Sequence, residues 1–541
     1  MTDLLPRPRH AEHVGGSFEL RAGATVSGAS ALVDGVRTAL AVLDLRVTDG
    51  GGGDIRVEHR PDLGPEEYTL DVGAAGVRIG AAERSGAFYA AQTLRQLLPP
   101  DAYRTVPPAG VWTVPGVHVA DAPRHSWRGL HLDVARHFLP KREVLRQLDI
   151  MALHKLNTLH LHLVDDQGWR IESRAHPLLH EVGSHRPRTL SSSYGEEPAY
   201  DEVPHGGYYT LADLAEIAAY ARARAITVVP EIDVPGHASA LLAAYPEYGP
   251  QPDRTHTVLD RWGVSPAIIS PLPQTVDFLS VVLGEVGEAL GSAPYMHIGG
   301  DECVLDDWAA SAEIVEYQRS LGLATLGDLH AWFLRRLADI LAERGTRAVV
   351  WDEAFGNGEL RQDTVVMPWR GAFIAQRAAA AGHDVVMTPV FPLYLDYGES
   401  GSPQEPLAIG EAITLDDVAS FEVAPASWTE EERARVVGAQ AQLWSERIPD
   451  ARTLDYRAWP RASALADITW SGTASDLAAL PGHLSRLDAY GVEYRPLSGP
   501  HPWQQGGTGR RRSRPGVIDV RAIMERLETM TRNSEAYSAS T

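Results

Sequence analysis

Two acidic side chains stand next to each other in the segment His297-Ile298-Gly299-Gly300-Asp301-Glu302. The apolar residues that lead into this segment are typical of a buried strand, and the two glycines allow the backbone to turn before the acids. Like charges in a low-dielectric site push the pKa values of neighbouring carboxyls apart, so one of them tends to keep its proton. We therefore predict that Asp301 and Glu302 share a cleft and supply general acid catalysis. The plainer alternative is a solvated acidic turn.

Short apolar runs, most of which end in a charged, imidazole or indole side chain, recur between residues 129 and 446, and most lead into a stretch with helical periodicity. The eight runs are 129–136, 158–166, 226–237, 295–302, 348–353, 364–369, 384–390 and 439–446. Eight strands that alternate with helices are typical of the (β/α)8 TIM barrel. The sequence therefore predicts an α/β fold of this type, with the residues at the strand ends gathered at one mouth of the barrel.

The remaining sequence divides the chain into three predicted parts. Residues 1–123 form a small N-terminal α+β domain with a hairpin over 68–79 and a helix over 86–98, and residues 124–504 form the barrel. Thr210 and Asp213 predict a capping box at the start of one barrel helix. Residues 505–541 are expected to form a basic linker and an amphipathic C-terminal helix, and the polar stretch 183–207 is expected to be a loop at the mouth.

Composition excludes several classes of function. The formal net charge of −22 disfavours nucleic acid and anionic membranes as partners, because phosphate contacts need clustered cations. A single cysteine, Cys303, excludes an internal disulfide framework and a cysteine-based zinc site. The N-terminal residues lack the apolar core of a signal peptide, and no apolar run reaches about 18 residues. We therefore expect a cytoplasmic protein without membrane segments.

Four segments, taken in chain order, resemble the glycoside hydrolase family 20 β-N-acetylhexosaminidases, and the resemblance extends over nearly the whole chain. The segments are Leu132-Asp133-Val134-Ala135-Arg136-His137-Phe138, His160-Leu161-His162-Leu163-Val164-Asp165-Asp166-Gln167-Gly168-Trp169-Arg170, Glu231-Ile232-Asp233-Val234-Pro235-Gly236-His237 and His297 to Glu302. The resemblance implies an exo-acting, retaining hydrolase that needs no cofactor or metal and removes terminal GlcNAc, with GalNAc as a second candidate, from N-acetylhexosaminide oligosaccharides such as chitobiose.

The same resemblance implies a role for each catalytic residue. In the family no enzyme carboxylate attacks the sugar, because the 2-acetamido oxygen of the substrate closes onto C1 and forms an oxazolinium ion. On this sequence Glu302 would be the general acid and then the general base, and Asp301 would orient the acetamido N–H. Tyr394 would hydrogen-bond the acetamido carbonyl oxygen. Asp165 and His237 would lie behind Glu302 and adjust its proton affinity.

Substrate-binding residues are implied in the same way. Trp351, Trp369 and Trp444 each follow a predicted strand, and the resemblance implies that Trp444 lies under the sugar ring and the other two around the acetamido methyl group. Arg136, Asp396 and Glu446 would hold ring hydroxyls through charge-assisted hydrogen bonds. Without the barrel, core packing would be the ordinary interpretation of each tryptophan.

Two other functions compete with this interpretation. His160-Leu161-His162 resembles the His-X-His of metal-dependent amidohydrolase barrels, with His237, Asp301 or Asp165 as further ligands. A non-catalytic carbohydrate-binding protein on the same barrel is the second alternative, although a lectin has no need of an acid with a raised pKa. The natural substrate, the linkage preference and the oligomeric state stay open.

Overall fold

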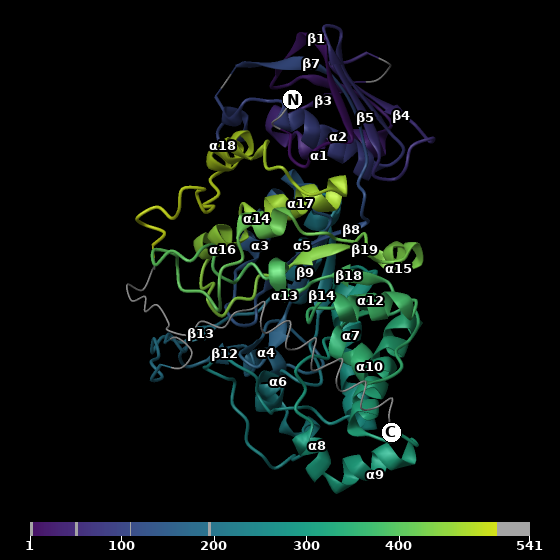
Figure 1. The fold of residues 1–541 in the computed structure, drawn as a ribbon, viewed down its shortest axis with the longest axis vertical. Coiled ribbons are helices and arrows are strands. Elements are labelled where there is room, and N and C mark those ends of the chain that lie inside the picture. The colour runs from purple at the N-terminus through teal and green to yellow at the C-terminus, as the bar shows by residue number, and fades with distance from the viewer. Residues whose placement is uncertain (1–3, 49–51, 109, 193–195, 506–541) are drawn as a thin grey trace.

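The computed structural model describes residues 4–48, 52–108, 110–192 and 196–505. A twisted sheet forms one end of the molecule, and a barrel forms the rest (Figure 1). The sheet has seven strands in the order β1-β7-β5-β6-β4-β2-β3. Their bounds are β1 His10–Arg21, β2 Thr25–Gly28, β3 Arg46–Val47, β4 Ile55–His59, β5 Tyr68–Gly73, β6 Gly76–Ala81 and β7 Val111–Asp121.

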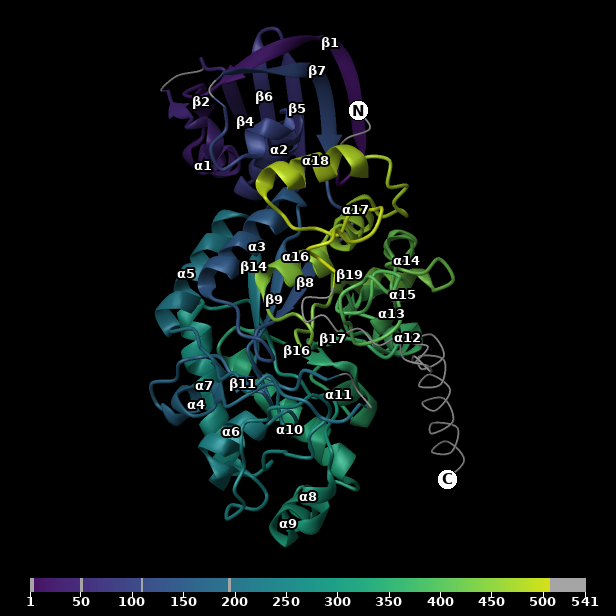
Figure 2. The ribbon, with the colours of Figure 1, turned by 90° about the vertical axis from the view of Figure 1, so that its left-hand side faces the viewer.

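One face of this sheet is turned toward the barrel. The predicted hairpin is the antiparallel pair β5 and β6, and alternate side chains of β5, namely Tyr68, Leu70 and Val72, are buried. They pack beneath helices α1 (Ser30–Ala39) and α2 (Arg84–Gln96), which lie between the sheet and the barrel (Figures 1 and 2). The amphipathic helix that the sequence predicts over 86–98 is therefore part of the contact between the two units.

Eight parallel strands close into a barrel, as the sequence predicts. In chain order they are β8 Trp127–Asp133, β9 Thr158–His162, β14 Thr227–Glu231, β15 Tyr295–His297, β16 Arg347–Trp351, β17 Val365–Met367, β18 Val385–Met387 and β19 Val436–Ala441. Pairing of β19 with β8 completes the ring. Each strand begins within or close to one of the predicted apolar runs, and each run ends beyond the carboxyl end of its strand.

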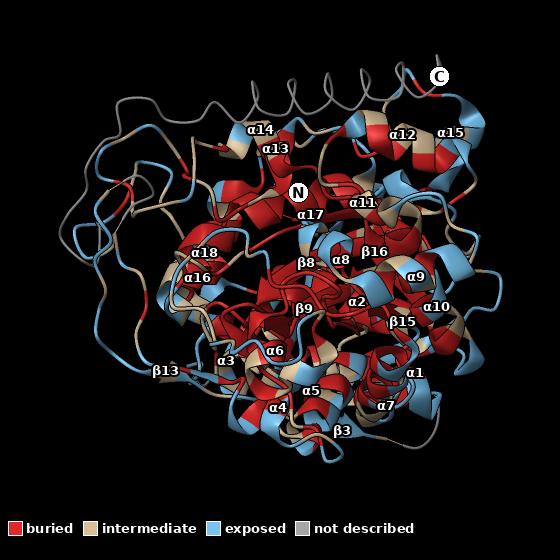
Figure 3. Ribbon diagram, turned by 90° about the horizontal axis from the view of Figure 1, so that it is seen from below, coloured by how far each residue is buried: buried red, intermediate tan, exposed pale blue. Residues whose placement is uncertain are grey.

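Helices surround the strands, and their apolar faces explain why the sequence forms them. The principal ones are α3 Lys141–Leu153, α5 Leu211–Ala223, α7 Pro273–Ala289, α10 Leu326–Glu343, α12 Ala372–Ala380, α16 Ala451–Ala458, α17 Arg461–Ser471 and α18 Leu480–Tyr490. Thr210 and Asp213 form the predicted capping box at the start of α5. Figure 3 shows buried strands in the middle and exposed residues on the outer helices, as this architecture requires.

Two short pairs of strands lie in the loops that follow β9. The predicted mouth loop contains a small antiparallel pair, β12 (His185–Arg186) with β13 (His205–Gly206). A second pair, β10 (Val164–Asp165) with β11 (Gly168–Trp169), follows β9 directly. The C-terminal helix that the sequence predicts within 505–541 lies outside the described residues, which end at 505. Among the helices that the structure describes, none has the length and apolarity needed to cross a membrane.

Candidate active site

All the residues that the sequence singles out lie at the carboxyl ends of the barrel strands or in the loops just beyond them. They come from all eight positions around the ring: Arg136 after β8, Asp165 in β10 after β9, His237 after β14, Asp301 and Glu302 after β15, Trp351 at the end of β16, Trp369 after β17, Tyr394 and Asp396 after β18, and Trp444 and Glu446 after β19. Residues separated by up to about 300 positions in sequence therefore meet at one mouth, as the barrel topology dictates.

The turn that presents the acid pair depends on glycine. Gly299 has a φ of +66°, and a Cβ atom at this position would lie 1.6 Å from Oδ1 of Asp233. The same Asp233 oxygen accepts a hydrogen bond from the backbone N–H of Gly300 at 3.3 Å. Glu302 itself has a φ of +50°, a left-handed conformation that non-glycine residues rarely adopt outside functional sites. The backbone is thus bent sharply enough to turn both acids toward the mouth.

Burial and neighbouring charges favour the protonated form of Glu302. Its side chain is 37% exposed, and burial raises its pKa above the ordinary value. His237 opposes this increase, whereas the negative charge of Glu353 adds to it. A carboxyl that keeps its proton above its ordinary pKa is suited to donate that proton to a leaving group.

Asp301 is more enclosed than Glu302. Its side chain is 13% exposed, and burial, followed by the negative charge of Asp233, raises its pKa well above the ordinary range. Burial likewise raises the pKa of Asp233 to about 7. Two neighbouring buried acids resist being charged together, whereas positive charge beside Asp301, such as that of His237, favours its anion.

His237 connects the acid pair to a second layer of carboxylates. Its Nε2 atom lies 3.5 Å from Oε2 of Glu302 and 3.7 Å from Oδ2 of Asp301. Its Nδ1 atom lies 3.3 Å from Oδ1 of Asp165 and 3.4 Å from Oδ2 of Asp166. Burial disfavours a charged imidazole, but Asp165 and then Asp233 outweigh it, and the pKa of His237 is raised well above its usual value. The structure therefore brings together the pair that the resemblance implies, Asp165 and His237.

Arg136 occupies the same layer. Its Nη2 atom lies 2.7 Å from Oδ2 of Asp165, its Nη1 atom 3.4 Å from Oδ2 of Asp133, and its Nε–H donates to Gln167 at 3.0 Å. Its guanidinium carbon lies 5.0 Å from the centroid of the Trp444 ring. Arg136 is therefore held rigidly, with one face against an aromatic ring.

Three of the acids that the sequence predicts for the site carry a buried oxygen that has no hydrogen-bond partner within the described part of the chain. These atoms are Oδ1 of Asp301, Oδ1 of Asp396 and Oε2 of Glu446. Burial raises the pKa of Asp396 and of Glu446. Buried acceptors are nearly always paired in proteins, so unpaired ones at the mouth of a barrel indicate a polar ligand.

The aromatic residues predicted for the sugar pocket, Trp351, Trp369, Tyr394 and Trp444, end or follow the adjacent strands β16, β17, β18 and β19. The ring centroid of Trp444 is 6.0 Å from that of Trp351 and 6.1 Å from that of Tyr394. The Trp369 indole donates to Oε2 of Glu353 at 3.0 Å. Trp351 is only 1% exposed and its indole donates to Oε1 of Glu231 at 2.8 Å, so it forms the floor beneath the other rings.

Several residues of the site were not identified from the sequence. Asp233 and Glu353 shape the charge around the acid pair, and Glu231 lies at the centre of the buried layer below it. Asp233 and Glu231 belong to a segment that resembles the family, and Glu353 ends a predicted strand run. Their position next to named site residues is the only signal that could have identified them.

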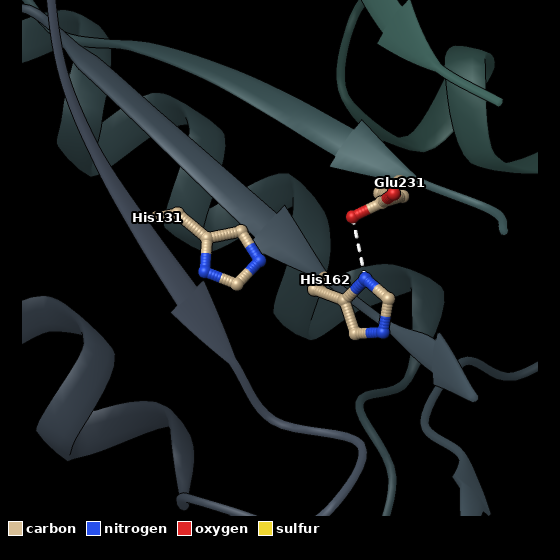
Figure 4. A group of neighbouring side chains, drawn as sticks. All are labelled: His131, His162 and Glu231. Atoms are coloured by element: carbon tan, nitrogen blue, oxygen red, sulfur yellow. Dashed lines mark hydrogen bonds and ion pairs between the residues drawn. The ribbon is translucent and has the colours of Figure 1, made fainter. Parts of the chain in front are cut away.

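Histidine and acidic side chains gather in the barrel around the His160-Leu161-His162 segment, which the sequence offers as an alternative metal site. His131, His162 and Glu231 offer ligand atoms within 4.8 Å of one another, and Figure 4 shows them on three neighbouring strands. However, Nδ1 of His162 faces Glu231 and its Nε2 faces Asp165 at 2.9 Å, so neither nitrogen is free for a metal. Metal ligation requires a lone pair on neutral imidazole. This donor set therefore fits an ion-pair network better than a metal.

Comparisons with known proteins agree with this geometry. Residues 125–473 match the model of "Glycosyl hydrolase family 20, catalytic domain", and residues 1–122 match that of "Glycosyl hydrolase family 20, domain 2". A β-hexosaminidase of Porphyromonas gingivalis is 38% identical over 461 residues, which are 84% of this chain and 57% of that protein. A β-hexosaminidase of Vibrio furnissii is 34% identical over 473 residues, which are 86% of this chain and 76% of that protein.

Solved structures give the same result. An exo β-N-acetylglucosaminidase of Vibrio harveyi, in complex with N-acetylglucosamine, superposes with a TM-score of 0.80 at 31% identity and covers 92% of this chain and 79% of its own. A mutant β-hexosaminidase of Streptomyces plicatus, in complex with its product GlcNAc, superposes with a TM-score of 0.77 at 31% identity. The match covers 92% of this chain and 98% of that chain.

Proposed function

Because this chain belongs to glycosyl hydrolase family 20 and is a glycoside hydrolase of the β-N-acetylhexosaminidase type, we propose that it is exo-acting and retaining and releases terminal non-reducing GlcNAc from oligosaccharides. GalNAc is a second candidate sugar. The sugar found in the related Vibrio harveyi and Streptomyces plicatus structures supports GlcNAc. The observation that carries the proposal is the position of His237 Nε2 between the Asp301 and Glu302 carboxyls, 3.7 Å and 3.5 Å from them.

The first step of the proposed reaction uses the acetamido group of the substrate as the nucleophile. Its carbonyl oxygen forms a bond to C1 while the bond from C1 to the glycosidic oxygen breaks, and Glu302 transfers its proton to that oxygen. The product of this step is an oxazolinium ion. The raised pKa of Glu302, caused mainly by burial, supports its role as the proton donor.

Asp301 and Tyr394 would act on the acetamido group. Asp301 would accept the acetamido N–H, and the Tyr394 hydroxyl would donate to the acetamido oxygen. Positive charge develops on this group only as the ring closes, and that charge would stabilise the Asp301 anion. An interaction that strengthens late in the reaction favours the transition state over the bound substrate.

The second step returns the enzyme to its starting state. A water molecule attacks C1, its proton passes to the Glu302 carboxylate, and the bond between C1 and the acetamido oxygen breaks. Two displacements at C1 preserve the β configuration of the released sugar. Asp165 and His237 would support both proton transfers, since they adjoin Glu302 throughout.

The remaining residues would bind the sugar ring. Arg136, Asp396 and Glu446 carry charged or unpaired polar atoms at the mouth and would bind ring hydroxyls. Trp444 would lie beneath the ring, and Trp369 would flank the acetamido methyl group. Trp351 would close the floor below them, since it is almost fully buried.

A panel of aryl β-glycosides tests the proposal. We expect rapid release of the aryl alcohol from the N-acetylglucosaminide, strong inhibition by a thiazoline analogue of the cyclised intermediate, and little turnover of the β-glucoside, which has no acetamido group. Equal turnover of both glycosides would refute substrate-assisted catalysis. Full activity after exhaustive dialysis against a chelator would exclude the amidohydrolase alternative, and any measured turnover would exclude a purely carbohydrate-binding role.

Variants of the acid pair test the two roles separately. Glu302→Gln should reduce turnover of chitobiose far more than that of an activated aryl glycoside, because only the poor leaving group needs protonation. Asp301→Asn should reduce turnover of both by about 10²-fold or more. Wild-type rates on chitobiose in either variant would contradict the assignment.

We also propose that the protein is cytoplasmic and degrades imported chitobiose-like sugars. Detection of its activity in the culture supernatant would contradict this proposal.

A further inference from the structure

We propose that His162, anchored by Glu231, is a positioning residue that fixes Asp165 and thereby holds His237 against the general acid Glu302. This inference rests on the proposed function, and it extends the Asp165 and His237 pair inward by two residues. It gives the His160-Leu161-His162 segment a role that does not require a metal. Neither His162 nor Glu231 reaches the mouth, since both side chains are fully buried.

An unbroken series of polar contacts runs from the centre of the barrel to the acid. Glu231 contacts Nδ1 of His162, and Nε2 of His162 lies 2.9 Å from Oδ2 of Asp165. Oδ1 of Asp165 lies 3.3 Å from Nδ1 of His237, and Nε2 of His237 lies 3.5 Å from Oε2 of Glu302. Figure 4 shows the first link, with His162 on β9 and Glu231 on β14.

The two oxygens of Asp165 have separate partners. Oδ2 contacts Nη2 of Arg136 at 2.7 Å and Nε2 of His162, whereas Oδ1 contacts His237 and accepts the backbone N–H of Asp166 at 2.6 Å. Partners on both oxygens fix the plane of the carboxylate. The direction in which Asp165 presents Oδ1 to His237 is therefore set by His162 and Arg136 together.

Glu231 is held from four sides, which makes it a suitable anchor. Its Oε1 atom accepts from the Trp351 indole at 2.8 Å and lies 3.0 Å from Nδ1 of His297. Its Oε2 atom contacts His162 and lies 3.1 Å from Nε2 of His160. These neighbours of Glu231 lie on β9, β15 and β16, so displacement of Glu231 would require three other strands of the barrel to adjust.

Charge balance supports the same arrangement. Burial lowers the pKa of His162, but the charge of Glu231 and the hydrogen bond to Asp165 outweigh it, and the pKa is raised well above its usual value. A cationic His162 donates from both ring nitrogens, one toward each carboxylate. Loss of this cation would leave two buried carboxylates facing each other with less compensation.

Two substitutions of His162 separate its contacts. The amide nitrogen of an asparagine can replace Nδ1 and reach Glu231, whereas that of a glutamine can replace Nε2 and reach Asp165. Both remove the imidazole and its charge. We expect His162→Asn to lower kcat on chitobiose by about 10²-fold, as expected when a catalytic group is misplaced by about 1 Å. His162→Gln should remain about tenfold faster than His162→Asn, the rate equivalent of one hydrogen bond.

The dependence of the rate on the leaving group distinguishes a defect in proton delivery from a loss of packing, which would slow both substrates equally. The deficit of His162→Asn should be large with chitobiose and small with an activated aryl N-acetylglucosaminide, because the defect is in proton delivery by Glu302. KM should change less than kcat. Equal rates for the two variants, or equal deficits on both substrates, would overturn the proposal. A wild-type enzyme without N-acetylglucosaminidase activity would instead refute the proposed function.

A second variant covers the case in which His162→Asn does not fold. Glu231→Gln keeps the shape of the side chain but removes the charge, and it should show the same dependence on the leaving group. The control is His483→Gln, a buried histidine bonded to His154 in the outer helices, 2.8 Å between their Nε2 atoms. It should lower the melting temperature without changing the ratio of rates on the two substrates. If Glu231→Gln kept the wild-type ratio of the rates on chitobiose and on the aryl glycoside, the proposal would be contradicted.

Discussion

The Nη2 atom of Arg136 lies 2.7 Å from Oδ2 of Asp165, and this contact joins the sugar-binding group to the residues behind the acid. Arg136 is proposed to bind ring hydroxyls, and Asp165 supports His237. Because both atoms are buried, the contact is only weakly screened by solvent. A sugar bound against Arg136 and the orientation of Asp165 are therefore mechanically linked.

Substitution of Arg136 should affect binding and chemistry together. Arg136→Ala removes the guanidinium from Asp133 and one of the cations beside Asp165, so we expect a loss of about 3 kcal/mol in the free energy of unfolding. KM should rise, and kcat on chitobiose should fall. Arg136→Lys keeps the charge but cannot contact both acids at once, and it should be more stable than the alanine variant yet still slow. Urea titrations and steady-state kinetics on chitobiose measure both effects. A variant with raised KM and normal kcat would show that the contact with Asp165 has no role in catalysis.

The pH dependence should reveal the charge of Glu353. Glu302 must be protonated to act as an acid, so kcat/KM for a poor leaving group should persist above the ordinary glutamate pKa and fall as pH rises through the raised pKa of Glu302. Burial is the main cause of that increase, and Glu353 contributes to it. Glu353→Gln removes a negative neighbour and lowers the pKa of Glu302. The alkaline limb should therefore move to lower pH, by about one pH unit at most.

Two features make this measurement specific. A glutamine at position 353 can still accept the hydrogen bond from the Trp369 indole, so the local geometry is preserved. Glu359, whose side chain is 94% exposed, provides the same change of net charge away from the site. Glu359→Gln should leave the profile unchanged. An alkaline limb that moves to higher pH in Glu353→Gln would show that Glu353 does not act through its charge.

The barrel and most of its mouth could be predicted from the sequence because their signals are local. Each strand is a short apolar run with a functional residue at its carboxyl end or a few positions beyond it, as in Trp351 at the end of β16. Once the runs are recognised as parallel strands, the topology gathers their ends, and no knowledge of side-chain contacts is needed. Even so, the resemblance to a known family was needed to give Tyr394 or Asp396 a role.

Contacts within the barrel could not be predicted in this way. A buried acid such as Glu231 looks the same in sequence as an exposed acid on an alternating strand. Its partner Trp351 is 120 residues away, and nothing local indicates that the indole turns inward to Glu231 instead of outward to the mouth. The same holds for Asp233, whose position against Gly299 depends on how two strands end side by side.

Gly299→Ala should abolish activity and destabilise the protein. A Cβ atom would lie 1.6 Å from Oδ1 of Asp233, and the φ of +66° is unfavourable for alanine. The clash would displace either Asp233 or the turn that carries the acid pair. Gly345→Ala is the matched control, because its φ is +76° but no atom lies within 4 Å of the added Cβ. The control should lose about 1–2 kcal/mol of stability and keep its kcat. Thermal melts and kcat on an aryl N-acetylglucosaminide would show whether the two variants differ as expected.

A buried ion pair joins the N-terminal domain to the barrel and should dominate the stability of their contact. Nζ of Lys155, just before β9, lies 3.1 Å from Oδ2 of Asp121 in β7 and donates to the Tyr68 hydroxyl at 2.8 Å. Both charged side chains are at most 1% exposed. Lys155→Met leaves an uncompensated buried carboxylate and should cost about 3–5 kcal/mol in urea unfolding. Addition of Asp121→Asn should recover part of that loss, because it removes the orphaned charge.

The pH dependence of stability tests the same pair. Burial raises the pKa of Asp121, but the charge of Lys155 and the hydrogen bonds from Tyr68 and Trp470 outweigh it, so the folded pKa lies below the ordinary aspartate value. The folded state therefore holds its proton less tightly than the unfolded state, and the resulting stabilisation is fully present above the ordinary aspartate pKa and lost as pH falls through the lowered pKa. The difference in unfolding free energy between wild type and Asp121→Asn should be constant from neutral pH down to that region and shrink below it. A difference that instead grows on acidification would mean that Asp121 is protonated in the folded protein and that Lys155 is not paired with a carboxylate.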